Sequence, residues 1–127
     1  MAQIEIPEVW RNQVCAILAT ESTDSLIEWT QDAETRYEAD ATAAKLLAGD
    51  TDPAWRYEVY RPFRDFLSSP HPTGCPVTMQ TPSGETYEFF FRFLGKKFYG
   101  KILLRTDRKR AVIFSAHRPL KPKLSCE

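Results

Sequence analysis

The first half of the chain has apolar residues at helical spacing. After Pro7, which suits the first turn of a helix, one apolar stripe contains Val9, Trp10, Val14, Ile17 and Leu18. This stripe predicts a helix over about residues 8–20. Residues 33–48 are rich in Ala, Glu and Leu and stop at Gly49, which predicts a second helix.

A third helix is predicted from Asp52, an N-cap residue followed by Pro53, to Leu67, with Pro62 as the point where it would kink. Between the first two helices, residues 22–32 fit a short helix and a loop equally well. The pattern therefore leaves that segment unassigned.

The second half changes to alternating polar and apolar residues, which is typical of strands. A Pro- and Gly-rich loop is expected at residues 68–76. Three runs after it alternate in this way, at residues 85–94, 99–106 and 111–117. A shorter candidate strand precedes them at residues 77–80. The joints between neighbouring runs are short, so an antiparallel meander is expected.

These patterns predict an α+β fold in a single domain over residues 1–127. Mainly helical, acidic residues 1–70 are expected to pack on one face of a C-terminal antiparallel β-meander of three to four strands. The meander would occupy the basic residues 77–117, and residues 118–127 would form a tail that leaves the sheet.

Alternation also predicts which side chains share a face of the sheet. A three-residue joint after the second long strand produces four cross-strand pairs: Ile102 with Phe114, Leu104 with Val112, Lys101 with Ser115, and Tyr99 with His117. The face away from the helices then carries Glu88, Arg92, Tyr99, Lys101, Arg105, Ser115 and His117. A joint of two or four residues would instead send His117 to the side of Ile102 and Leu104.

Charge is divided unevenly along the chain, although the formal net charge is zero. Residues 1–60 carry 4 basic and 12 acidic side chains, whereas residues 61–127 carry 13 basic and 5 acidic ones. Within residues 92–123, eleven basic side chains accompany only Asp107. Such a cluster suits the phosphate backbone of a nucleic acid; the alternative is that the two halves complement each other inside the fold.

The three cysteines, Cys15, Cys75 and Cys126, match neither a disulfide framework nor the spacing of a zinc site. We therefore predict three free thiols, with Cys15 in the core. His71 and His117 lie far apart without a carboxylate cluster, so no metal and no cofactor is expected. Apolar runs are too short for a membrane helix and the N-terminus lacks the order of a signal peptide, so we expect a cytoplasmic protein without membrane contact.

The polar face has the groups that metal-independent RNA cleavage needs. A base must accept the 2′-hydroxyl proton, an acid must protonate the leaving 5′-oxygen, and cations must stabilise the charge of the phosphorane. The candidate catalytic residues are His117, Lys101, Arg105, Ser115 and Glu88. The candidate RNA contacts are Arg92, Lys96, Lys97, Tyr99, Arg108, Lys109, Arg110, Arg118 and Lys121.

Residues 99–119, YGKILLRTDRKRAVIFSAHRP, resemble the closing hairpin of the barnase, colicin and RelE-like ribonuclease toxins. In that group a basic strand precedes an apolar strand that ends in a polar tip such as Ser-Ala-His. The resemblance implies antiparallel strands with a basic concave face, RNA as the substrate, and an inhibitory protein partner such as an antitoxin or immunity protein. It also implies that His117 is an acid or base, that Lys101 and Arg105 bind phosphate, and that Ser115 is an orienting hydroxyl. The resemblance does not support a catalytic role for Glu88.

Three functions follow from these observations and compete. The first is a small metal-independent endoribonuclease, toxin-like or RNA-processing. The second is a noncatalytic module that binds nucleic acid or an acidic protein through the basic meander. The third is an adaptor that uses the acidic helical half. Each site residue also has an ordinary interpretation: a surface or capping histidine for His117, solvent-facing strand cations for Lys101 and Arg105, and an ion pair for Glu88.

Overall fold

The sheet has six strands in the part of the chain that this computed structural model describes, residues 2–22 and 25–127. Their order across the sheet is β1 (Ile4–Glu5), β3 (Thr73–Val77), β4 (Gly84–Phe93), β5 (Lys96–Arg105), β6 (Ala111–His117) and β2 (Ile27–Trp29). Only β2, which runs parallel to β6, departs from antiparallel pairing among these described strands. The class is α+β, but the predicted meander of three to four strands is wrong, because the N-terminal half supplies both edge strands.

The third strand of the chain also differs from the prediction. The candidate at residues 77–80 is wrong, since β3 lies at Thr73–Val77 and all of it except Val77 falls in the segment expected to be a loop. Gly74 permits this pairing because a Cβ at that position would collide with the backbone oxygen of Glu88 on β4. The next hairpin, between β4 and β5, turns at Leu94 and Gly95 with positive φ at both residues, as a two-residue hairpin requires.

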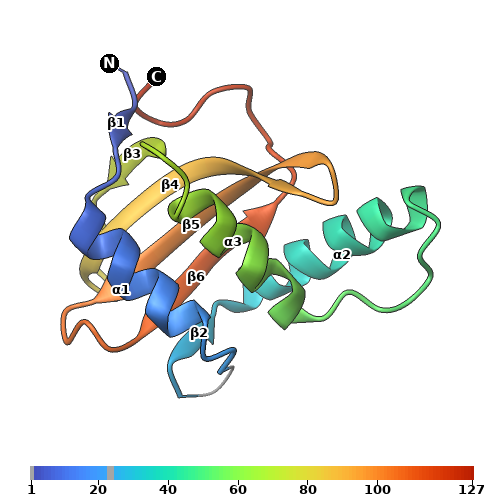
Figure 1. Cartoon of the computed structure of the whole chain (residues 1–127), viewed down its shortest axis with the longest axis horizontal. Helices are drawn as coiled ribbons and strands as arrows, with labels where there is room; N and C mark the ends of the chain where they lie inside the picture. The colour runs from blue at the N-terminus through green and yellow to red at the C-terminus, as the bar shows by residue number, and fades with distance from the viewer. Residues whose placement is uncertain (1, 23–24) are drawn as a thin grey trace.

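Two helices cross one face of the sheet, as Figure 1 shows: α1 (Glu8–Leu18) and α3 (Tyr60–Leu67). α1 follows β1 and precedes β2, so it carries the chain from one edge of the sheet to the other. α2 (Gln31–Leu47) packs against β6 and extends beyond the sheet. The predicted first and second helices are therefore confirmed.

The segments around these helices are partly different from the prediction. Residues 27–29 of the unassigned stretch form β2, and residues 23–24 lie outside the described part. In place of one helix from Asp52, the chain forms a 3-10 turn, Arg56–Val59, that leads into α3. Pro62 lies in the first turn of α3. The N–H groups of a first turn have no intrahelical acceptor, so the N–H that proline lacks costs no hydrogen bond there.

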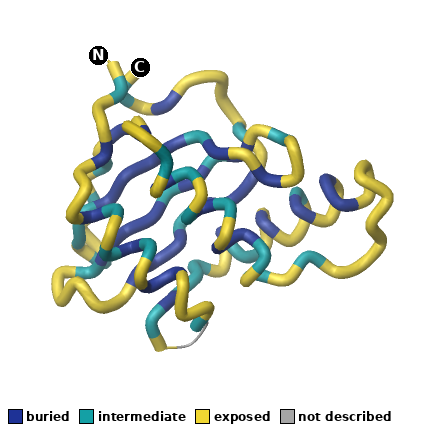
Figure 2. Tube along the Cα trace, viewed as in Figure 1, coloured by how far each residue is buried: buried dark blue, intermediate teal, exposed yellow. Residues whose placement is uncertain are grey.

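The core lies between the helices and one face of the sheet, where Figure 2 shows buried strands. The predicted aromatic face of β4 is confirmed: Tyr87, Phe89, Phe91 and Phe93 all belong to the core. Phe63 of α3 lies with its ring centroid 4.6 Å from that of Phe91. A Cβ at Gly100 would come within 2.8 Å of the Phe63 and Phe89 rings, so only glycine permits this close packing of helix on sheet.

A β-bulge decides the register between β5 and β6. Leu104 pairs with Ala111 and Ile102 with Ile113, so the predicted pairs with Val112 and Phe114 are wrong. The hydrogen bond from Arg105 N to Arg110 O leaves a four-residue joint rather than three. The register shift between Lys101 and Ile102 then inserts one extra residue on β6. This bulge returns Ser115 and His117 to the face opposite the helices, so two of the predicted pairs are confirmed: Lys101 with Ser115, and Tyr99 with His117.

The prediction of three free thiols is wrong. Cys75 and Cys126 form a disulfide with their Cα atoms 5.7 Å apart, and Cys15 is the free cysteine among the described residues. The disulfide brings the C-terminal end of the chain beside the N-terminal end, as Figure 1 shows. None of the helices in residues 2–22 and 25–127 is long and apolar enough to cross a membrane.

Candidate functional site

Two rows of side chains cross β4, β5 and β6 on the face opposite α1 and α3. Cross-strand pairing aligns Glu88, Lys101 and Ser115 in the first row. The second row contains Phe90, Tyr99 and His117. The backbone register therefore brings four of the five predicted catalytic residues together, and Tyr99 lies among them.

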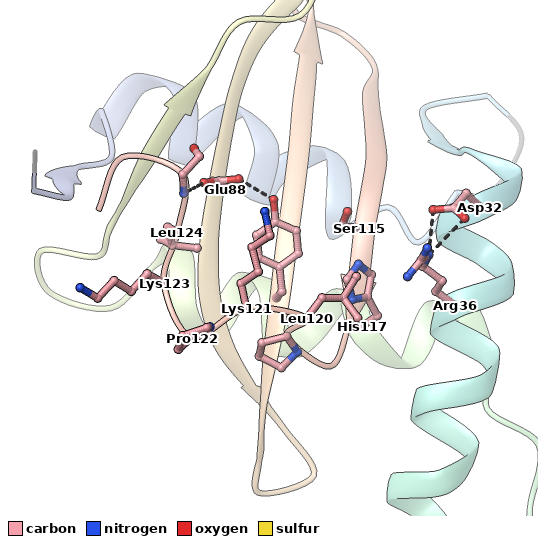
Figure 3. A pocket seen from close by; sticks show the side chains of 13 residues that line it. Asp32, Arg36, Glu88, Ser115, His117, Leu120, Lys121, Pro122, Lys123 and Leu124 are labelled. Carbon is pink, nitrogen blue, oxygen red and sulfur yellow. Dashed lines mark hydrogen bonds and ion pairs between the residues drawn. The ribbon is translucent and has the colours of Figure 1, made fainter.

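A cavity of about 670 Å³ lies above these rows. Its floor includes Glu88, Tyr99, Ser115 and His117, and Asp32 and Arg36 of α2 form one side. The opposite wall is the C-terminal segment Pro119–Ser125, here called the strap, which crosses the face of the sheet in Figure 3. The volume is in the range of small-ligand sites.

His117 is held in one orientation by its own neighbour. Its Nδ1 lies 2.7 Å from the carbonyl oxygen of Arg118. Because a carbonyl can only accept, Nδ1 donates the proton, and the neutral ring then has its acceptor at Nε2. Nε2 makes no hydrogen bond within the described residues, and the ring lies 5.5 Å from that of Tyr99. His117 therefore presents a proton acceptor to the cavity.

Glu88 is buried and accepts two hydrogen bonds. Ser125 donates its backbone N–H to one carboxylate oxygen, and Tyr99 donates its hydroxyl to the other, each at 2.5 Å. Burial raises the pKa of Glu88, but these hydrogen bonds and the charge of Lys101 outweigh it, so the pKa falls below its ordinary value. Glu88 is therefore an ionised anchor for Tyr99 and the strap, and not a proton donor.

The tyrosine hydroxyl is fixed in its protonated form. Burial and the adjacent Glu88 carboxylate raise the pKa of Tyr99 well above its ordinary value. Its proton is engaged by Glu88, so Tyr99 offers the cavity a ring face and a hydroxyl oxygen that can accept. This arrangement suits stacking or orienting a ligand and does not suit proton abstraction.

Arg105 is separated from the other predicted catalytic residues. Its Nε and Nη2 contact the two oxygens of Glu28 at 2.5 and 2.8 Å, which joins β5 to the edge strand β2. This bidentate pair occupies hydrogen-bond donors of the Arg105 guanidinium, which was expected to bind phosphate. Arg105 therefore has a structural partner that the sequence does not indicate, because the two residues have a sequence separation of 77.

We expect the Glu28–Arg105 pair to make stability depend on pH. The hydrogen bond from Arg105 lowers the pKa of Glu28, so the pair stabilises the fold above the ordinary carboxyl value of 4.5 and loses that effect as pH falls through the lowered pKa. Glu28→Gln should therefore lower the urea midpoint at pH 7 and differ little from wild type at pH 2–3. Asp65→Asn, which removes an exposed carboxylate without an ion pair in the described chain, is the control. A Glu28→Gln deficit that is equal at both pH values would contradict this prediction.

The predicted RNA contacts divide between the two ends of β5. Arg92 and Lys97 pair across β4 and β5 on the cavity face, and Lys97 Nζ lies 3.9 Å from the Phe90 ring centroid. Lys96 begins β5 at the same end, and Arg118 and Lys121 follow β6, with Lys121 lining the cavity. The turn residues Arg108, Lys109 and Arg110 lie at the far end, roughly 30 Å away along a ten-residue strand.

The turn cations also have local partners. Arg108 contacts Gln13 and Glu85, and Arg110 contacts Asp107. The eleven basic residues therefore do not form one continuous patch. Lys121 and Lys123 line the cavity, and Arg92, Lys97 and Lys101 lie on the same face of the sheet as its floor.

Apart from Lys121, which was a predicted RNA contact, the strap is the part of the site that sequence reasoning missed, because residues 118–127 were expected to leave the sheet. Its cavity-lining members are Pro119, Leu120, Lys121, Pro122, Lys123, Leu124 and Ser125. The available signal was Cys126, whose disulfide partner in β3 lies in register with Glu88.

Within the described residues, no cluster of three or more His, Cys, Asp or Glu side chains is arranged to hold a metal ion. Comparison of the chain with protein-family models, with curated proteins and with solved structures finds no match.

Proposed function

We propose that this protein is a small endoribonuclease that cleaves RNA by attack of the 2′-hydroxyl on the adjacent phosphodiester, without a metal ion. The observation that carries the proposal is His117, whose Nδ1 is held by Arg118 and whose Nε2 faces a cavity edged by lysines. The likeness of residues 99–119 to the ribonuclease toxin hairpin agrees with this chemistry and remains part of the proposal.

In this proposal one group, His117, serves as both the base and the acid. Nε2 of His117 accepts the 2′-hydroxyl proton as that oxygen attacks phosphorus, and the imidazolium returns a proton to the leaving 5′-oxygen. The backbone carbonyl of Arg118 stabilises the imidazolium, because it accepts from Nδ1 in both states.

Charge in the transition state is stabilised by the neighbouring row. Lys101 lies between Glu88 and Ser115, and its ammonium is the cation on the strand beside His117. The Ser115 hydroxyl makes no hydrogen bond within the described residues, so it is available to a phosphate oxygen. Phe90 and Tyr99 supply ring faces on which a base can stack.

The direct test is incubation of the purified protein, in the presence of a reductant and excess EDTA, with end-labelled single-stranded RNA. Products that carry 2′,3′-cyclic phosphate ends support the proposal. A salt-sensitive gel shift with intact RNA would favour the noncatalytic binding module instead. If the protein neither cleaves nor binds RNA, both the nuclease and the noncatalytic binding module are contradicted. That result would favour an adaptor that uses the acidic helical half.

RNA affinity should depend on the cations beside the cavity. The double variant Arg92→Ala, Lys97→Ala removes two cations at the cavity end of β5. Each phosphate contact on a single strand contributes roughly 0.7 to the slope of log affinity against log salt, so the double variant should reduce that slope by about 1.4. The matched comparison is Arg108→Ala, Lys109→Ala and Arg110→Ala together at the far turn. We expect a smaller change from the turn variant, because two of those arginines already pair with local partners.

Salt titrations of RNA binding by filter retention measure both slopes. A turn variant that loses as much slope as the cavity-end variant would place the RNA across the whole of β5 and β6. Binding that does not change with salt would remove the phosphate backbone from the interaction.

A further inference from the structure

The strap is fastened at both of its ends. At its start, the backbone N–H of Arg118 donates to Asp40 of α2 at 2.8 Å. At its end, Cys126 is bonded to Cys75 of β3. Since β3 pairs through β4 and β5 to β6, strap and sheet together form a closed ring around the cavity, part of which Figure 3 shows.

Between these ends the strap has few contacts of its own. Leu124 is buried, and Ser125 donates its N–H to Glu88. Leu120 is 72% exposed, and Lys121, Pro122 and Lys123 are exposed as well. The strap contains no helix or strand, and two prolines remove backbone donors from it. The disulfide is therefore the strongest link that holds the strap over the sheet.

The closed ring restricts what can reach His117. A small ligand fits a cavity of about 670 Å³, but an RNA strand cannot be laid across the sheet from the side while the strap is fastened. Access for the middle of a strand requires that one end of the strap be released. At Arg118 the chain is covalently continuous with β6, so only cleavage of the Cys75–Cys126 disulfide can open the ring.

We propose that the Cys75–Cys126 disulfide is a redox latch on the cavity: when oxidised it holds the strap over His117 and excludes RNA strands, and when reduced it releases the strap and admits them. The inference rests on the proposed ribonuclease function for its ligand. Thiols are kept reduced in the cytoplasm, so the latch would be open there and closed in an oxidising compartment.

The reductant is a protein or small-molecule dithiol. One of its thiolates attacks Sγ of Cys126, which is partly exposed, whereas Cys75 is fully buried. The S–S bond breaks, Cys75 leaves as a thiolate and takes up a proton, and a mixed disulfide forms at Cys126. The second thiol of the reagent then attacks its own mixed-disulfide sulfur and releases Cys126 as a thiol. Two electrons and two protons pass to the protein, and the dithiol becomes a disulfide.

The first measurement is hydrogen exchange, which needs no activity. Peptides covering residues 118–127 are compared in oxidised wild type, in wild type reduced with dithiothreitol, and in Cys126→Ser. We expect the amides of Arg118 and Ser125 to lose protection in the last two samples, while β4, β5 and β6 keep theirs. Cys15→Ser retains the disulfide and is the matched control, so it should behave as wild type in both redox states.

The second measurement is the affinity for a single-stranded RNA oligonucleotide in the His117→Ala background, where binding is observed without cleavage. Reduction should tighten the apparent affinity about tenfold or more, because apparent affinity scales with the fraction of molecules that can bind. Cys126→Ser should bind as tightly as the reduced protein, with or without the reductant.

The outcomes separate the latch from the proposed function. Unchanged exchange in residues 118–127 on reduction, or opening of the strap with equal RNA affinity in both states, would overturn the latch. Tighter binding on reduction without cleavage by the His117-containing protein would support the latch and contradict the nuclease. Cleavage at equal rates by oxidised and reduced protein would support the nuclease and overturn the latch.

Discussion

His117→Ala is expected to cleave RNA roughly 10²–10⁴-fold more slowly than wild type, the usual loss when a general acid or base is removed. RNA affinity should change little, because the imidazole acts on a proton and the phosphate is bound by cations. The measurement is single-turnover cleavage by reduced protein, with melting temperature and RNA binding recorded in parallel. His71→Ala is the matched control, since His71 is exposed and pairs with Glu5 outside the cavity.

Lys101→Ala should behave differently from His117→Ala. A fixed charge stabilises both the bound phosphate and the transition state, so its removal should lower the rate and the affinity together. Arg105→Ala should affect stability more than rate, because its guanidinium is engaged by Glu28. Wild-type cleavage by His117→Ala would remove the histidine from the mechanism and favour the noncatalytic binding module.

The second large effect concerns stability. Loss of the disulfide in Cys126→Ser should lower the free energy of unfolding by roughly 4 kcal/mol, because the bond closes a loop with a sequence separation of 51 and so restricts the unfolded chain. Urea denaturation of oxidised wild type and of Cys126→Ser, followed by tryptophan fluorescence, measures the difference. Cys15→Ser, which leaves the loop closed, should change stability much less.

A Cys126→Ser protein as stable as oxidised wild type would show that the disulfide does not constrain the unfolded chain. Addition of dithiothreitol provides a second comparison: it should lower the stability of wild type and of Cys15→Ser, and leave Cys126→Ser unchanged. This result is separate from the local release of the strap, which hydrogen exchange reports in the folded protein.

Several elements could be predicted because neighbouring residues determine them. The helical spacing around Trp10 and Val14 predicts α1, which the structure confirms at Glu8–Leu18. The alternation from Tyr87 to Phe93 predicts the aromatic face of β4, which is also confirmed. In these elements the buried pattern repeats within a few residues, so a local sequence contains the required information.

The edge strands could not be predicted in this way. β1 has two residues and β2 has three, too few for any alternation to be recognised. Their pairing with β3 and β6 depends on α1, which carries the chain across the sheet. The strand count was therefore wrong, although the longer strands of the meander were recognised.

Two errors in the predicted hairpin between β5 and β6 cancelled at the site. The expected three-residue joint is a four-residue joint, which alone would have sent His117 toward the helices. The bulge opposite Lys101 adds one residue to β6 and reverses that change. Turn length and bulges are set by how the two strands pack on the helices, which the sequence of the hairpin does not report.

The sequence by itself determined which residue types could meet on one face: alternation in β4 and β5, with the Ser-Ala-His end of β6, assembles Glu88, Lys101, Tyr99, Ser115 and His117. Tertiary structure alone decided how that face is used. It pairs Arg105 with Glu28, pairs Arg108 with Glu85 away from the cavity, and fastens the strap through Cys75 and Cys126. The physical reason is distance along the chain, because these contacts join residues tens of positions apart and no local pattern encodes them.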